Sequence, residues 1–173
     1  MCSSDLKTAQ INCKTGRICF YWWPELPHMK GWHTDSDVNY SMGENGINVL
    51  IPDGYSFANA GVIIYAEAVY KPRYESSNPK TKTLEGFIAD DEQEFRTNNP
   101  GDLTIADTTP LKTGDGYALR SVTYFRPKAK NWERVSFGEE GDYYLIFTLN
   151  AHSLKEYDAA QKTYESLLNL YKQ

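Results

Sequence analysis

The end of the chain pairs a strongly apolar segment with an amphipathic one, and this pair limits the possible folds most. Residues 142–150 (Asp-Tyr-Tyr-Leu-Ile-Phe-Thr-Leu-Asn) are mostly aromatic, aliphatic or β-branched, which predicts a buried strand. Ser153 and Glu156 form an S-x-x-E capping box that predicts a helix over 153–172. The apolar positions of this segment recur at helical spacing: Tyr157, Ala160, Tyr164, Leu167, Leu168 and Tyr171. A strand that runs into a covering helix predicts a layered fold. His152, between the two, is interpreted as a junction residue.

A second amphipathic helix is predicted in the middle of the chain, over 83–97. Thr83 is suited to cap its first turn, because its hydroxyl can accept a backbone N–H. The predicted apolar face consists of Leu84, Phe87, Ile88 and Phe95. The acidic run over 90–94 is interpreted as the solvated face, since a cation site would need carboxylates from several segments.

Apolar or alternating runs predict the remaining strands, at 18–23, 47–51, 61–70, 103–112, 117–126 and 132–138. Residues 61–70 begin as a continuous apolar run and end in alternation, which favours a central strand. Pro110 favours an edge position for residues 103–112. The order of elements predicts an α+β fold with a mostly antiparallel sheet. Residues 24–46 are predicted to be irregular, and long connections of this kind are often functional.

A hairpin is predicted between the last two strands. Residues 139–141 (Glu-Glu-Gly) fit a three-residue loop with its glycine in the left-handed region. That loop places Phe137 opposite Tyr143. It also places Val135 opposite Leu145, so two apolar pairs would face each other across the hairpin.

Arg120 and Arg134 fall on neighbouring predicted strands. The predicted hairpin sets Arg134 opposite Ile146. One interpretation is that the two arginines share a sheet face and bind an anion. The interpretation that we favour is that they pair with Glu133 or with a helix carboxylate.

Length and charge narrow the class of protein. The 173 residues suit one domain, which we assign to 11–173 after a polar tether at 1–10. The formal net charge of −5 argues against non-specific nucleic-acid binding. The sequence has no apolar run of about 18 residues, so no transmembrane helix is predicted.

The three cysteines suggest a compartment. Cys13 and Cys19 flank Lys-Thr-Gly-Arg-Ile, a turn that would set them opposite each other and allow a disulfide; the alternative is two free thiols. Cys2 directly follows Met1, and we interpret it as the lipidated cysteine of a mature lipoprotein, with an incidental cysteine as the alternative. These interpretations predict an exported or lipid-anchored protein of the bacterial periplasm or outer membrane. A cytoplasmic location is the alternative.

From residue 47 onward the chain resembles the PsbP/Mog-like superfamily. The resemblance rests on Ile-Pro-Asp-Gly at 51–54, the strand at 62–70, the acidic helix at 83–97, and the final strand at 143–149 with its capped helix. It implies an α/β/α sandwich, and DcrB-like envelope proteins and several lipoproteins belong to this group. Most members are binding or accessory modules. Residues 27–33 and 131–134 also look like stretches of uncharacterised exported proteobacterial proteins.

One loop gathers the side chains best suited to binding: Trp22, Trp23, His28, Trp32, His33 and Asp35. Aromatic rings, imidazoles and a carboxylate can line a pocket for a ligand or a partner. His28 and His33 can also ligate a metal with Asp35, but this spacing is not specific to metal sites. The alternative is that the tryptophans pack the loop onto the sheet, with the histidines at its rim.

No G-x-S-x-G, Walker, dinucleotide-binding, H-E-x-x-H or paired C-x-x-C motif occurs in the sequence. We therefore nominate no catalytic residue, cofactor or metal. The sequence favours a non-catalytic envelope protein that binds a protein partner or a small ligand, in an accessory or immunity-type role. One alternative is a hydrolase or metal-dependent enzyme that uses the Trp22–Asp35 loop. Another is a cytosolic protein–protein adaptor.

Overall fold

The computed structural model describes residues 6–12, 18–35, 47–72, 74 and 78–173. Its centre is a seven-stranded sheet in which neighbouring strands run antiparallel. The strand order is β3 (Trp32–Thr34), β4 (Asn48–Pro52), β5 (Val62–Tyr70), β9 (Tyr143–Ala151), β8 (Asn131–Glu140), β7 (Ala118–Arg126) and β6 (Thr104–Lys112). Two short 3₁₀ helices, η1 (Pro79–Thr81) and η2 (Pro127–Ala129), lie in connections.

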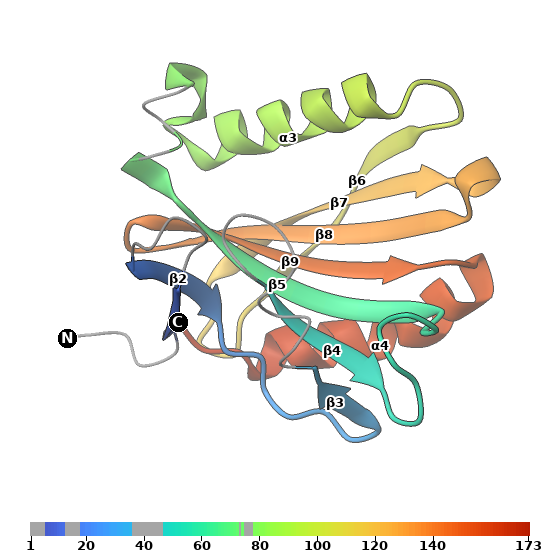
Figure 1. Cartoon of the computed structure of the whole chain (residues 1–173). Helices are drawn as coiled ribbons and strands as arrows, with labels where there is room; N and C mark the ends of the chain where they lie inside the picture. The colour runs from blue at the N-terminus through green and yellow to red at the C-terminus, as the bar shows by residue number, and fades with distance from the viewer. Residues whose placement is uncertain (1–5, 13–17, 36–46, 73, 75–77) are drawn as a thin grey trace.

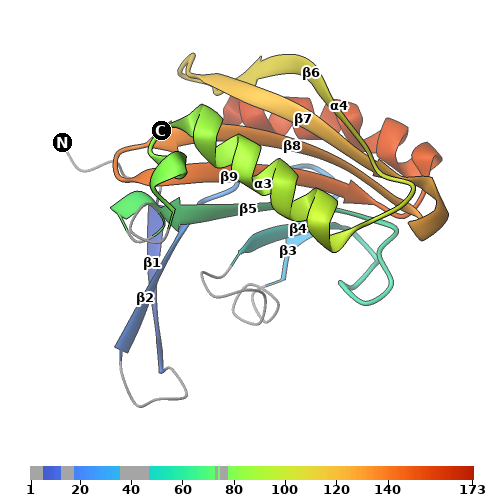
Figure 2. The same cartoon turned by 90° about the horizontal axis from the view of Figure 1, so that it is seen from above.

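A long helix lies on each face of the sheet, α3 (Leu84–Asn98) on one and α4 (Leu154–Leu170) on the other (Figure 1). The view from above shows α3 in front of the sheet and α4 behind it (Figure 2). The predicted α+β sandwich, with its antiparallel sheet and C-terminal helix, is confirmed.

Strand alternation divides the core into two layers, because successive side chains point to opposite faces. Phe147 and Tyr164 belong to the layer beneath α4. Phe137 and Tyr144 belong to the layer beneath α3, where Phe87 stacks on Tyr144 with ring centroids 4.4 Å apart. Each helix therefore buries its apolar stripe against a different face.

Both predicted helix caps are present. The Ser153 hydroxyl accepts the Glu156 backbone N–H at 3.2 Å and donates to the Glu156 carboxylate at 2.6 Å. The Thr83 hydroxyl accepts the Gly86 N–H at 3.1 Å. Among the described residues, no helix is both long and apolar enough to cross a bilayer.

The hairpin between β8 and β9 has a shorter turn than predicted. Glu140 pairs with Tyr143, so the loop contains only Gly141 and Asp142. Gly141 has a φ of +52°, the left-handed backbone that a tight hairpin turn demands. The predicted register was therefore wrong: Phe137 lies opposite Ile146.

The two arginines lie on opposite faces of the sheet. Arg134 pairs with Thr123, which is an odd number of residues from Arg120. Arg134 meets the helix carboxylate of Glu165 at 2.8 Å, and Arg120 meets Asp107 at 2.7 Å. The interpretation that both arginines share a face and bind an anion is therefore wrong. The pairing of Arg134 with a helix carboxylate is confirmed.

The N-terminal segment contains a separate hairpin of β1 (Leu6–Asn12) and β2 (Ile18–Pro24), which projects from the sheet in Figure 2. Residues 6–10, expected to lie in a tether, thus belong to a strand. In this hairpin Cys19 pairs with Ile11, so the predicted register, with Cys13 directly opposite Cys19, was wrong. Cys2 and Cys13 lie outside the described residues, and the lipid anchor and the disulfide stay predictions.

Candidate functional site

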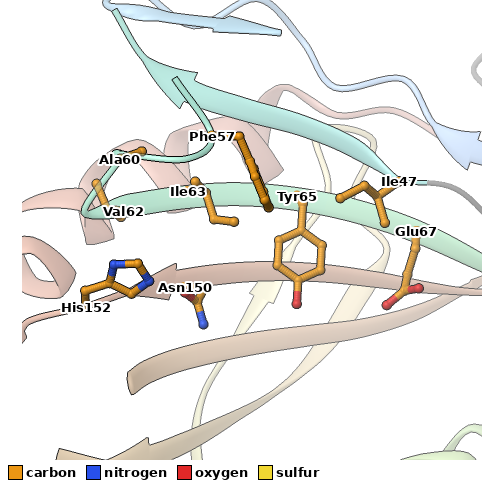
Figure 3. A pocket seen from close by; sticks show the side chains of 9 residues that line it. All are labelled: Ile47, Phe57, Ala60, Val62, Ile63, Tyr65, Glu67, Asn150 and His152. Carbon is orange, nitrogen blue, oxygen red and sulfur yellow. The ribbon is translucent and has the colours of Figure 1, made fainter. Parts of the chain in front are cut away.

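A cavity of about 420 Å³ opens on the α3 side of the sheet, along strand β5. We call it the β5 cavity. Its walls come from β5, from the end of β9 and from the segment between β4 and β5 (Figure 3). The lining residues are Ile47, Phe57, Ala60, Val62, Ile63, Tyr65, Glu67, Asn150 and His152.

The cavity exists because α3 covers only part of its sheet face. Phe87 and Ile88 of α3 pack against residues of β7, β8 and β9. The β4 and β5 end of this face has its own apolar cluster, in which Ala60, Phe57 and Ile63 take part. The β5 cavity is lined by residues of this second cluster, and none of its lining residues belongs to the α3 layer.

The cavity is elongated along β5. Ile63, Tyr65 and Glu67 alternate along the strand and share a face, and Figure 3 shows them in a row. Ile63 and Glu67 are four residues apart, or about 13 Å at about 3.3 Å per residue. His152 lies at the end of the row away from Glu67. One end of the cavity is therefore mainly apolar, and the other carries a carboxyl group.

Glu67 is partly buried in a region of negative charge. Burial, and then the charge of Asp91 on α3, raise the pKa of the Glu67 carboxyl to about 7. Burial is also the main cause that raises the pKa of Asp91 to about 6, against a hydrogen bond from Tyr124. Each of these two carboxyl groups therefore keeps its proton to a higher pH than an exposed carboxyl group would.

Glu133 on β8 is the third carboxyl group on this face. Burial raises its pKa, and hydrogen bonds from Asn131 and Asn150 oppose the rise. Both amide groups donate to the same Glu133 oxygen at 2.7 Å. Because Asn150 also lines the β5 cavity, this network connects the cavity wall to the sheet interior.

Two tyrosines complete the polar part of the face. Burial, and then the nearby Glu133 and Glu67, raise the pKa of Tyr65, which forms a hydrogen bond with Thr148. The Tyr124 hydroxyl donates to Asp91 at 2.8 Å, and burial raises its pKa. Both phenols therefore stay protonated at any physiological pH.

Three of the six site residues predicted from the sequence meet at a second cavity, of about 390 Å³. His28, Trp32 and His33 line it, together with Glu25, Leu26, Thr34 and Leu50. The His33 ring nitrogen lies 3.3 Å from a carboxylate oxygen of Asp53. Trp32 also packs against the core layer beneath α4, in agreement with the alternative that the tryptophans pack this loop onto the sheet.

The other three predicted residues are not among those that line this cavity. Asp35 directly follows β3, and the structure describes only the backbone of Trp22 and Trp23, in β2. Among the described residues, no group of three or more His, Cys, Asp or Glu is arranged to hold a metal ion.

The sequence interpretation missed the β5 cavity, although β5 carried a signal. Glu67 is a charged residue in the interior of a strand predicted to be central. A charge at such a position indicates a buried or functional carboxyl group. His152, interpreted as a junction residue, also lines this cavity.

Comparison with family models and with curated proteins gave no match. Among solved structures, cyanobacterial PsbP (CyanoP) from Synechocystis sp. PCC 6803 is similar over 99% of this chain and 96% of that chain, with 12% identity and a TM-score of 0.54. The likeness confirms the PsbP-type fold. The Ran-binding protein Mog1p from Saccharomyces cerevisiae aligns over 92% of this chain and 85% of that chain, with 12% identity and a TM-score of 0.44.

Proposed function

We propose that this chain is a non-catalytic binding protein whose ligand is a small molecule with an apolar body, held in the β5 cavity. Five of the nine lining residues are apolar, and Tyr65 adds an aromatic ring. Small-ligand sites are typically concave and apolar, with a few polar groups that orient the ligand. Of the two partner classes expected from the sequence, this cavity favours a small ligand over a protein.

The proposal includes a location in the bacterial envelope. It rests on the cysteine interpretation from the sequence, in which Cys2 is acylated and Cys13 and Cys19 form a disulfide. Mass spectrometry of the protein from its native host tests this point. An acyl mass on Cys2 would support it, and a free Cys2 thiol would contradict the lipid anchor.

A neutral fluorescent probe tests the cavity itself. We expect N-phenyl-1-naphthylamine to bind the full chain saturably at one site. Ala60→Phe and Ile63→Phe place a larger side chain in the cavity wall, and we expect each to weaken binding by about tenfold or more. Thermal melts identify which variants fold.

Leu154→Phe is the matched control, because Leu154 is half exposed on α4, on the other side of the sheet. We expect this variant to bind the probe as the parent does. Unchanged binding in both folded cavity variants would place the probe elsewhere and contradict the proposal. So would an absence of saturable binding.

A further inference from the structure

We infer that the ligand of the β5 cavity carries a positive charge, as an organic amine with an apolar body, and that its ammonium group binds at Glu67. This inference rests on the proposed function and adds the chemical class of the ligand. Three observations support it: Glu67 lies in the cavity wall, none of the described residues pairs with its carboxyl group, and the charges around it are mostly negative.

The Glu67 carboxyl group faces the cavity. It lines the cavity wall, beside Tyr65 in Figure 3. Within the described part of the chain, no hydrogen-bond donor and no basic side chain acts on its carboxyl group. A carboxyl group in this position usually receives a hydrogen bond or an opposite charge. A bound ligand is the natural source of one.

The groups that act on Glu67 and its surroundings are mostly acidic. Asp91 reaches it from α3, and Glu133 and Glu67 both act on Tyr65. Arg126 is a basic residue that acts on Glu133. Arg120, on the same face as Glu67, is engaged by Asp107 at 2.7 Å. The local field therefore favours a cation and opposes an anion.

The apolar part of the cavity fits the apolar body of the proposed ligand. Its body would lie along Ile63 and Phe57, and its ammonium group would reach the Glu67 end. An ammonium next to a carboxylate forms a charge-assisted hydrogen bond, and the Tyr65 ring offers a cation–π contact. His152, at the other end, is exposed and has room to stay hydrated.

Binding of a cation at this position is linked to protons. The ammonium would favour the ionised form of Glu67, whose pKa is about 7 in the free protein. The ammonium would likewise favour the ionised forms of Asp91 and Glu133, whose pKa values burial raises in the free protein. A neutral or anionic ligand would not favour ionisation. Affinity for an amine should therefore rise as the pH increases from about 5 to about 8, while the amine itself stays protonated.

Three indole probes with one apolar body test the inference: tryptamine, neutral tryptophol and anionic indole-3-propionate. Titrations are followed by NMR shifts of the full chain at about pH 5 and about pH 8. At the higher pH we expect tryptamine to bind about tenfold more tightly than tryptophol, the size of one charge-assisted hydrogen bond. Indole-3-propionate should bind most weakly.

Glu67→Gln should reduce the affinity for tryptamine by about tenfold and leave the affinity for tryptophol within about twofold. It should also remove the pH dependence. Asp158→Asn is the matched control, since Asp158 is an exposed carboxylate on α4, and it should change neither affinity.

Two results would overturn the inference. One is equal or tighter binding of tryptophol or indole-3-propionate, and the other is unchanged tryptamine binding in Glu67→Gln. If N-phenyl-1-naphthylamine still binds and is still blocked by Ala60→Phe, the cavity remains the ligand site and only the charge assignment fails. If that neutral probe also fails to bind, the proposed function fails as well.

Discussion

Arg134 shows how one buried charge ties a helix to the sheet. Only 5% of this residue is exposed, and its guanidinium donates to Glu165 and Gln161 of α4 and to the Thr109 carbonyl. Its charge also lies over the Tyr164 ring, 5.9 Å from the centroid. A buried cation of this kind depends on its carboxylate partner.

We therefore expect Glu165→Gln to lower the free energy of unfolding by about 1 kcal/mol, a modest value because the Glu165 side chain is 44% exposed. Urea unfolding measures this change. Asp158→Asn on the same helix should stay within about 0.5 kcal/mol of the parent. Equal effects of the two variants would show that the pairing of Arg134 is not what matters.

For Glu67 we expect the opposite effect of removing a charge, because the folded state destabilises the ionised form of its carboxyl group. Its pKa of about 7 exceeds the ordinary value of 4.5, so between these values the folded state keeps a proton that the unfolded state has lost. The free energy of unfolding should fall as the pH rises through this window and then level off. Below this pH window, Glu67 is protonated in both the folded and the unfolded state, so it does not destabilise the fold.

Glu67→Gln should therefore stabilise the ligand-free protein by roughly 1–3 kcal/mol at about pH 8 and change little at about pH 4. Urea unfolding across this range measures the difference. A constant difference at all pH values would contradict the assignment, because a packing effect does not titrate.

At the level of elements, α3 has a glycine in its first turn that propensity alone would disfavour. A β-carbon at Gly86 would overlap the backbone carbonyl oxygen of Lys80, in the middle of the preceding η1. Alanine normally stabilises a helix by about 1 kcal/mol relative to glycine. Here the close approach of two backbones outweighs that preference.

Gly86→Ala should thus lower the free energy of unfolding by about 1–3 kcal/mol. Thermal and urea unfolding test this. Ser166→Ala, inside α4, is a helix substitution without such an overlap and should stay within about 0.5 kcal/mol. A stabilised Gly86→Ala variant would show that η1 moves away at little cost.

The hairpin of β8 and β9 shows where local prediction stops. A strand, a glycine turn and a second strand were all identified from the residues. The length of the turn was not, because both registers pair apolar side chains across the hairpin. Packing decided between them: β8 must present Phe137 to α3 and Arg134 to α4, and the two-residue turn at Gly141 allows this.

For the whole molecule, the order of strands within the sheet depends on contacts between distant parts of the chain. β5 lies beside β9, the strand that ends the sheet in sequence, and this pairing brings Tyr65 next to Thr148. No spacing in the sequence encodes that neighbourhood. The β5 cavity arises from it, because residues near 60, 67 and 150 must meet to form its walls.

The candidate site residues also divide into those that are close in sequence and those that only the tertiary structure brings together. His28, Trp32 and His33 are close in sequence, and they do share a cavity. Glu67, Asp91 and Glu133 come from β5, α3 and β8, and only tertiary packing brings them onto one face. Glu67 was therefore visible in the sequence as an unusual charge, but its neighbours were not.

By itself the sequence determined what local periodicity can encode: the buried strand at 142–150, the capped and striped helix after it, the acidic helix and the α+β class. These follow from side-chain spacing, hydrogen bonding at helix ends and turn chemistry, which act over a few residues. The tertiary structure alone decided the hairpin register, the opposite faces of Arg120 and Arg134, and the cavity at Glu67. Those depend on how distant surfaces pack and on the desolvation of charges that packing brings together.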